Sequence, residues 1–282
     1  MIPHDVLFSS LVGLNKLQED SKKIKRNDMN KEIVPTVAVI TPAYNAARFI
    51  RDTIESVQSQ TYRSWEIIIV DDCSSDNTCD IVEEKARIDN RIRLIRLERN
   101  GGPANARNVA IKAAAGRYIA FLDSDDLWLP EKLERQLAFV QKNEAVLSFT
   151  QYRRISITGN QYGKLITIPS TIDYRGLLKN TAIATSTVIV DRKKSGPIEM
   201  VSTYYDDLVL WLDLLKRGII AHGLQEDLMR YRIVGKSVSR NKFKSSLWVW
   251  RTYRNIEKLS PPYSVWCFLS YAIRACIKYK DF

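Results

Sequence analysis

Tyr118-Ile-Ala-Phe-Leu-Asp-Ser-Asp-Asp-Leu-Trp128 is the stretch that decides the fold, because an apolar segment in it runs directly into three carboxylates. Residues 118–122 are short and apolar, as expected of a buried strand. Asp123, Asp125 and Asp126 follow where the chain leaves the sheet. Open α/β sheets bind their ligands at this edge. The stretch therefore predicts an α/β fold with an acidic binding site at the end of this strand.

The chemistry of this cluster points to a divalent cation. Neighbouring carboxylates repel one another unless a cation neutralises them. Oxygen ligands with no His or Cys beside them suit Mg²⁺ or Mn²⁺, which usually complete their coordination with water and substrate phosphates. The alternative is that the acids cap the helix predicted over residues 130–143, where Asp is common. Capping needs only one acid, so we favour a metal site that holds a diphosphate.

The rest of the pattern alternates between strands and helices. Asn45 is predicted to cap the helix that carries Ile50, Ile54 and Val57. Strands separated by helices of this length indicate a parallel sheet with helices on both faces. Up to residue 122, strands are predicted at 37–40, 65–70, 92–97 and 117–122, and further helices at 79–88 and 104–115. Beyond residue 143 we expect strands at 145–155 and 185–190 and helices at 173–179 and 204–216.

Two more acidic pairs stand out. Asp71-Asp72 follows the second strand and should face the same edge of the sheet as Asp123. Asp206-Asp207 begins a helix, where the pair either caps the helix or supplies a carboxylate base. The chain has no P-loop, and Asn100-Gly-Gly-Pro-Ala104 does not fit the dinucleotide fingerprint. A nucleotide bound here must be held by a metal and by side chains.

Composition limits the class of protein. The chain has 282 residues and a net charge of +11, and residues 236–282 contain ten Lys/Arg against two acids. Such a tail favours an anionic membrane surface, nucleic acid or a phosphorylated substrate. Four cysteines without metal-type spacing indicate reduced thiols in a cytoplasmic protein. No apolar run reaches the ~18 residues that a membrane-spanning helix needs.

Over residues 35–239 the sequence resembles the family 2 inverting glycosyltransferases of GT-A fold. The resemblance rests on motifs in series: Thr41-Pro-Ala-Tyr-Asn45, Trp65-Glu-Ile-Ile-Ile-Val-Asp-Asp72, Asn108 with Gly116-Arg-Tyr-Ile119, Asp123-Ser-Asp125 and Asp207-Leu-Val-Leu-Trp211. It implies a Rossmann-like nucleotide-binding half and a mixed central sheet. Cys73 stands where the family commonly has Gly, and Asp206 where it commonly has Glu. The Gln-x-x-Arg-Trp motif of processive synthases is absent, which favours the addition of a single sugar.

The resemblance also implies a role for individual residues. Thr41 and Tyr44 would line the nucleotide pocket, and Asp72 would bond the uracil. Asp125, helped by Asp123, would hold Mn²⁺ or Mg²⁺ against the donor diphosphate. The base that deprotonates the acceptor hydroxyl would be Asp207. Two further candidates are Arg232 and Ser239. They would lie near the diphosphate, and the alternative is that they belong to a surface loop.

The family core is expected to be flanked by two segments, so that residues 1–34 form an extension, 35–240 the GT-A domain and 241–282 a basic, aromatic tail. The extension is either a short amphipathic helix or disordered. In the tail, residues 265–277 are apolar. They favour an amphipathic helix on an anionic membrane surface over the alternative, a helix packed on the catalytic domain with a solvated basic face. Nucleic acid is not expected as a partner, because the acidic site would repel it.

The expected activity is the transfer of one hexose from UDP-glucose or UDP-galactose to a lipid-linked acceptor. GlcNAc-diphospho-undecaprenol in O-antigen or related polysaccharide assembly is the favoured acceptor, at the cytoplasmic face of the bacterial inner membrane. The alternatives are a nucleotidyltransferase, which would release pyrophosphate, and a non-catalytic nucleotide-binding scaffold. Sugar and linkage depend on residues 145–205, where no motif guides the assignment.

Overall fold

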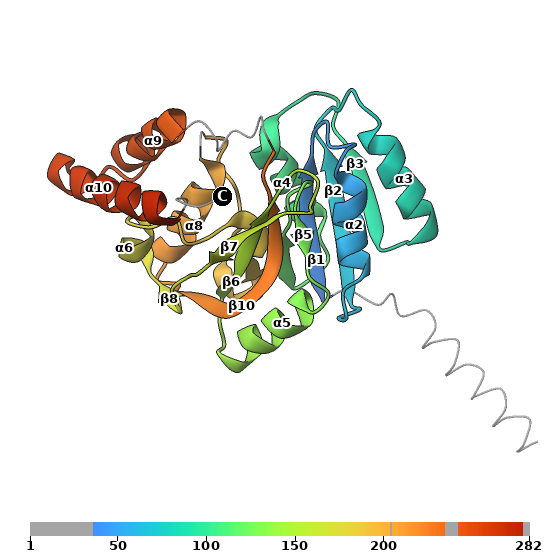
Figure 1. The fold of residues 1–282 in the computed structure, drawn as a ribbon, viewed down its shortest axis with the longest axis horizontal. Helices are drawn as coiled ribbons and strands as arrows, with labels where there is room; N and C mark the ends of the chain where they lie inside the picture. Colours follow the sequence, from blue (N-terminus) through green and yellow to red (C-terminus); the bar gives the residue numbers. More distant parts are fainter. Residues whose placement is uncertain (1–35, 204, 235–241, 279–282) are drawn as a thin grey trace, which may run out of the picture. The chain divides into compact units, whose positions relative to one another are not determined.

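The computed structural model describes residues 36–203, 205–234 and 242–278 (Figure 1). The predictions for the 1–34 extension and for Ser239 lie outside these residues. The described strands form one mixed sheet in the order β3-β2-β1-β4-β9-β6-β10-β5, with β7 paired to β6 and β8 to β10. From residue 36 onward, the described residues belong to one compact unit.

The first half of the sheet is parallel. β1 (Val37–Ala43) pairs on one side with β2 (Trp65–Asp71) and on the other with β4 (Tyr118–Phe121). At the edge, β3 (Ile92–Arg96) pairs with β2. The connections are α2 (Ile50–Gln58), α3 (Thr78–Ile88) and α4 (Gly102–Ala113). This arrangement confirms the predicted alternation of strands and helices.

The second half makes the sheet mixed. β9 (Ile189–Asp191) runs antiparallel to both β4 and β6 (Leu147–Ile155). β10 (Ala221–Arg232) pairs in parallel with β6 along its whole length. The short strands of this half are β5 (Leu127–Trp128), β7 (Tyr162–Ile166) and β8 (Thr171–Ile172). Its helices are α5 (Lys132–Lys142), α6 (Tyr174–Leu177), α7 (Arg192–Ser195) and α8 (Asp206–Lys216), with a 3₁₀ turn η1 (Thr185–Thr187).

Two local predictions were wrong. The strand expected at 185–190 begins only at Ile189, because η1 comes first and is closed by a hydrogen bond from Thr187 N to Ala184 O. Asn45 does not cap α2, which begins at Ile50. Asn45 instead has φ 49°, and its Oδ1 accepts a 2.9 Å hydrogen bond from Ser75 N. It ties the loop after β1 to the loop after β2.

Alternating strand residues divide the core into two hydrophobic clusters, one on each side of the sheet. Val37 and Val39 belong to one cluster, and Ala38 and Ile40 to the other. Just before β4, a Cβ at Gly116 would lie 2.5 Å from the backbone N of Ala38, so only glycine fits there.

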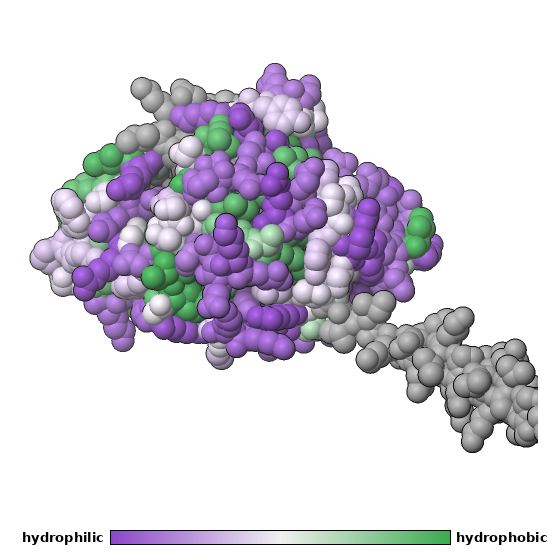
Figure 2. Space-filling view, turned by 90° about the horizontal axis from the view of Figure 1, so that it is seen from below, coloured by the Kyte–Doolittle hydropathy of each residue, from purple (hydrophilic) through white to green (hydrophobic). Residues whose placement is uncertain are grey.

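The surface on the side of α5 and β10 is mainly hydrophilic, with small separate hydrophobic areas (Figure 2).

The C-terminal helices α9 (Lys242–Arg251) and α10 (Pro261–Lys278) flank a π-helical turn, η3 (Thr252–Ile256). They lie beside α6 and α8, at the opposite end of the molecule from α3 (Figure 1). Tyr253, Cys267 and Tyr271 are buried in the same hydrophobic cluster as the apolar face of α8. The inner face of the tail is therefore packed on the catalytic domain, and the favoured contact of the tail with a membrane stays a prediction. None of the described helices is long and apolar enough to cross a membrane.

Candidate active site

The acidic loop after β4, residues 123–126, is hydrogen-bonded to both β10 and η1. Asp126 is 1% exposed, and its Oδ1 accepts a 2.9 Å hydrogen bond from Arg232 N at the end of β10. Its Oδ2 accepts a 2.6 Å bond from Ser186 Oγ in η1. Burial and the nearby Asp125 raise its pKa well above the usual range. The capping interpretation is wrong, because α5 begins after Glu131 and receives no side-chain cap.

Asp125 is the carboxylate best placed to bind a cation. Burial, followed by the charge of Asp123, raises its pKa to about 6. Its carboxylate accepts no hydrogen bond from another residue that the structure describes. The described residues contain no group of three or more His, Cys, Asp or Glu side chains that could hold a metal. A divalent ion still fits the donor chemistry, because Mg²⁺ or Mn²⁺ is commonly held by one or two carboxylates together with substrate phosphates.

Arg107 is a site residue that the sequence reasoning missed. It lies on α4, is 8% exposed, and its Nη2 donates a 2.5 Å hydrogen bond to Asp123 Oδ1. The charges of Asp123, Asp207 and Asp206 outweigh burial and raise its pKa. This cation therefore interacts with the acids after β4 and with those at the start of α8. A lone arginine within the Ala-rich segment 104–115 was the signal that could have revealed it.

The two acids of α8 have different surroundings. Asp206 Oδ1 accepts a 2.7 Å hydrogen bond from Thr203 N and closes the turn before the helix. Asp207 Oδ2 accepts a 2.8 Å bond from Thr185 Oγ1, and its Oδ1 a 2.7 Å bond from Leu208 N. Neither acid is the N-cap residue, which is Tyr205, but both stand in the first turn of α8, where the helix dipole favours them.

The turn η1 connects the acidic groups. Thr185 binds Asp207, and the next residue, Ser186, binds Asp126 and accepts a 3.0 Å hydrogen bond from Asp123 N. Two adjacent side chains thus fix the start of α8 against the loop after β4. The predicted base and metal-binding acids therefore share one edge of the sheet.

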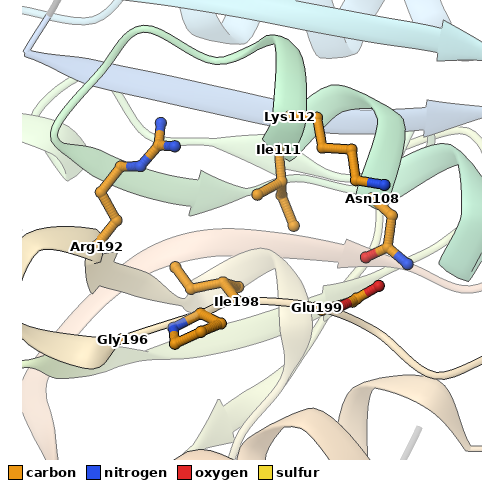
Figure 3. A pocket seen from close by; sticks show the side chains of 8 residues that line it. Asn108, Ile111, Lys112, Arg192, Gly196, Ile198 and Glu199 are labelled. Atoms are coloured by element: carbon orange, nitrogen blue, oxygen red, sulfur yellow. The ribbon is translucent and has the colours of Figure 1, made fainter.

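Asn108 fixes the segment that leads into α8. Its Nδ2 donates to Met200 O at 2.7 Å, and its Oδ1 accepts from Met200 N at 2.8 Å. Asn108 also lines a cavity of about 290 Å³ between α4 and residues 192–199 (Figure 3). Its lining residues are Asn108, Ile111, Lys112, Arg192, Gly196, Pro197, Ile198 and Glu199. None of the acids described above lines this cavity, so it is a neighbour of the candidate site and not its centre.

The residues predicted to bind the nucleotide lie after β1 and β2. Thr41 is fully buried in β1, and its hydroxyl has no hydrogen-bond partner among the described residues. Tyr44, just beyond the strand, is 55% exposed. Asp72 is buried, and its two carboxylate oxygens accept 2.8 Å hydrogen bonds from Gly101 N and Gly102 N at the start of α4.

Arg232 is the last residue of β10 and is 4% exposed, so its interpretation as part of a surface loop is wrong. Its Nε donates a 2.9 Å hydrogen bond to Asp125 O, and its Nη1 one of the same length to Ile157 O. Its Nη2 lies 3.2 Å from Asp52 Oδ2. Arg232 thus braces the backbone of the acidic loop.

Comparison with known proteins identifies the family. The profile described as "Glycosyl transferase family 2" matches residues 38–195. The chain belongs to this family. A relative from Bacillus subtilis (strain 168), which carries the name of a teichuronic acid biosynthesis glycosyltransferase, TuaG, is 46% identical over 86% of this chain and 97% of its own length.

Two relatives of this family 2 glycosyltransferase from Escherichia coli are named UDP-Glc:α-D-GlcNAc-diphosphoundecaprenol β-1,3-glucosyltransferases. WfgD is 42% identical over 74% of this chain and 81% of its own. WfaP is 38% identical over 87% of this chain and 97% of its own.

Solved structures agree on the fold. Staphylococcus aureus TarS 1–349 in complex with UDP-GlcNAc matches with a TM-score of 0.63, at 22% identity, over 86% of this chain and 72% of its own. The mannosyltransferase PcManGT of Pyrobaculum calidifontis, in complex with GDP-Man and Mn²⁺, matches with a TM-score of 0.61, at 16% identity, over 87% and 76%. At these identities the likeness shows the fold alone, which is the expected GT-A fold with a mixed central sheet.

Proposed function

We propose that this family 2 glycosyltransferase is an inverting enzyme that transfers one hexose from a UDP-sugar to a lipid-linked acceptor. The observation that carries the proposal is the pair of side-chain contacts made by the turn η1. Thr185 binds Asp207, and Ser186 binds Asp126 in the acidic loop after β4. Inversion by a single displacement needs two separate groups, one at the leaving diphosphate and one at the attacking hydroxyl. The turn η1 holds the proposed base against the loop that carries the proposed metal ligands, which supports this division of roles.

At the donor side we assign Asp125, helped by Asp123, to a divalent ion. Mn²⁺ or Mg²⁺ bound there would neutralise the charge that develops on the departing UDP. Thr41, Tyr44 and Asp72 are proposed to hold the nucleoside, in line with UDP-sugar binding by TarS. Their contribution is to orient the donor so that its anomeric carbon is open to attack from the opposite side.

At the acceptor side we assign Asp207 as the base. A carboxylate can take the proton of the attacking hydroxyl as the new bond forms. The hydrogen bonds from Thr185 Oγ1 and Leu208 N fix the orientation of this carboxylate. One displacement then gives a β-linkage from an α-linked donor.

The favoured acceptor is GlcNAc-diphospho-undecaprenol, and the favoured donor is UDP-glucose, with UDP-galactose as the second choice. The names of WfgD and WfaP support this acceptor and the glucose donor. Such an acceptor places the proposed reaction at the cytoplasmic face of the bacterial inner membrane. O-antigen or related polysaccharide assembly is the process it would serve.

The test is a transfer assay with UDP-glucose or UDP-galactose, Mn²⁺ and a GlcNAc-diphosphate-lipid analogue, read as a mass gain of one hexose. We expect Asp207→Asn to lower turnover by about 10²-fold or more, which is the usual size of a general-base contribution, and to leave UDP binding unchanged. Asp213→Asn is the matched control, because Asp213 lies on the same helix and is half exposed. Full turnover by Asp207→Asn would refute the base, and pyrophosphate release would indicate a nucleotidyltransferase. UDP binding without transfer to any acceptor would indicate a scaffold.

A further inference from the structure

The outer face of α10 is apolar although its inner face is already packed. Ser264, Cys267 and Tyr271 recur at helical spacing and are buried against the catalytic domain. Val265, Trp266, Leu269 and Ile273 point the other way and are 46%, 61%, 53% and 60% exposed. Four of the eleven exposed large hydrophobic side chains of the described residues thus lie on this one helix. We call these four residues the outer face of α10.

The positive charge around the outer face of α10 favours an anionic partner. Within the described residues from 258 to 278, the sequence contains Lys258, Arg274 and Lys278 and no Asp or Glu. The side chains of Lys258 and Arg274 are exposed. Apolar and aromatic side chains bordered by cations are typical of helices that lie in the interface of an anionic bilayer. The indole N–H of Trp266 can remain at the level of the headgroups while its ring is buried.

Contacts just before α10 and on its inner side attach it to the rest of the domain, where Cys267 and Tyr271 join the core. The Glu257 carboxylate, 2% exposed, accepts a 2.5 Å hydrogen bond from the Tyr174 hydroxyl of α6 and lies 2.8 Å from Lys216 Nζ of α8. Trp250 of α9 and Phe268 of α10 stack edge to face at 5.9 Å. Docking through the outer face would therefore hold the whole catalytic domain at the membrane.

We propose that the outer face of α10, Val265, Trp266, Leu269 and Ile273, docks on an anionic lipid surface and holds the active site at the depth of its acceptor. The part concerning the acceptor rests on the proposed function, whereas the lipid contact rests on the exposure and charge of this helix. Truncation of the tail would not test it cleanly, because Tyr253, Cys267 and Tyr271 are part of the core. Substitutions confined to the exposed face leave that core intact.

The experiment is co-sedimentation of the full chain with vesicles made of equal parts phosphatidylglycerol and phosphatidylcholine. We expect Leu269→Glu/Ile273→Glu to reduce the partition coefficient by about tenfold or more, since it removes two apolar contacts and adds two charges that an anionic surface repels. Ile88→Glu is the matched control, because Ile88 is 80% exposed on α3 and should leave the partition unchanged. Leu269→Ser/Ile273→Ser should give a smaller loss, and higher salt should weaken binding of the wild type.

Equal partition of wild type and Leu269→Glu/Ile273→Glu would overturn the proposal. A wild-type dimer that this variant dissociates, together with no vesicle binding, would overturn it in favour of a second copy of the chain on this face. Transfer to a water-soluble GlcNAc-diphosphate analogue separates the two proposals. The variant should retain full activity on the soluble analogue and lose activity only on an acceptor embedded in vesicles. Vesicle binding through α10 without any transfer would refute the proposed function and leave the docking surface standing.

Discussion

Thr185 Oγ1 donates a 2.8 Å hydrogen bond to Oδ2 of Asp207, so the proposed base is held from outside its own helix. The bond crosses from η1 to α8, and the residue after Thr185 binds the acidic loop. The orientation of the base therefore depends on a turn that also contacts the proposed metal site.

Thr185→Val should lower kcat about tenfold or more, because a hydrogen bond to a charged group is worth roughly 1.5–3 kcal/mol. The KM for the UDP-sugar should change little, since Thr185 contacts the acceptor-side carboxylate. Steady-state kinetics with each substrate varied in turn measure kcat and KM separately. Thr185→Ser keeps the hydroxyl and should restore most of kcat. Equal loss in the Ser and Val variants would point to packing of the methyl group instead of the hydrogen bond.

Arg107 and Asp123 should show strong coupling in a double-mutant cycle. Their side chains are 9% and 30% exposed, so Arg107→Met leaves Asp123 without its ion-pair partner. We expect it to lower the free energy of unfolding by on the order of 2–3 kcal/mol, as for other ion pairs removed from one side. Arg107→Met/Asp123→Asn should recover about half of that loss. Chemical denaturation at neutral pH measures all four corners of the cycle, and strict additivity would contradict direct pairing.

Asp125→Asn should stabilise the metal-free protein while abolishing transfer. The folded state raises the pKa of Asp125 to about 6, above the usual value for an aspartate, so it binds this proton more tightly than the unfolded chain does. The stability of the metal-free wild type should therefore rise as the pH falls from about 6 towards 4. Asp125→Asn should add on the order of 1–2 kcal/mol at pH 7, where the wild-type carboxylate is charged.

Thermal unfolding in the presence of a chelator measures this effect across the pH range. Mn²⁺ should stabilise the wild type at neutral pH, lose that effect as the pH falls below about 6, and leave Asp125→Asn unaffected. A variant that melts at a lower temperature than the chelated wild type would contradict the expectation.

Glu257→Ala should loosen the C-terminal helices. Its carboxylate is buried between Tyr174 and Lys216, and its removal should cost about 2 kcal/mol of unfolding free energy and increase proteolysis within α9 and α10. Glu84→Ala is the control, since its ion pair with Arg51 is exposed and should matter little. Unchanged protease resistance in Glu257→Ala would show that the apolar contacts alone hold these helices.

The order of elements in the first half could be predicted from the sequence, because each strand there is a short apolar run and each helix carries one apolar stripe. The acids after β2 and β4 could be placed at one edge for the same reason, since parallel strands end together. The second half was harder. Residues 185–187 contain two β-branched threonines, which favour a strand. The bonds of Thr185 and Ser186 to distant acids hold them in a 3₁₀ turn instead.

Long-range contacts also explain what the motifs did not reveal. From the sequence alone, Arg107 is one more charged residue on a predicted helix. The structure shows that the loop after β4 places Asp123 beside it. Arg232 gave no sign that its backbone N–H binds Asp126, 106 residues away in sequence. The packed state of α10 depends on a core cluster that Cys267 and Tyr271 share with residues far away in the sequence, which periodicity within the helix cannot indicate.

The two hydrogen bonds between Asn108 and the backbone of Met200 have a consequence for how such enzymes diversify. They join the nucleotide half to the segment before α8 through main-chain atoms, which every residue except proline would supply at position 200. The segment can therefore change its sequence without losing its attachment. Chimeras that exchange residues 145–205 between relatives should keep this attachment as long as each retains an amide side chain at this point of α4.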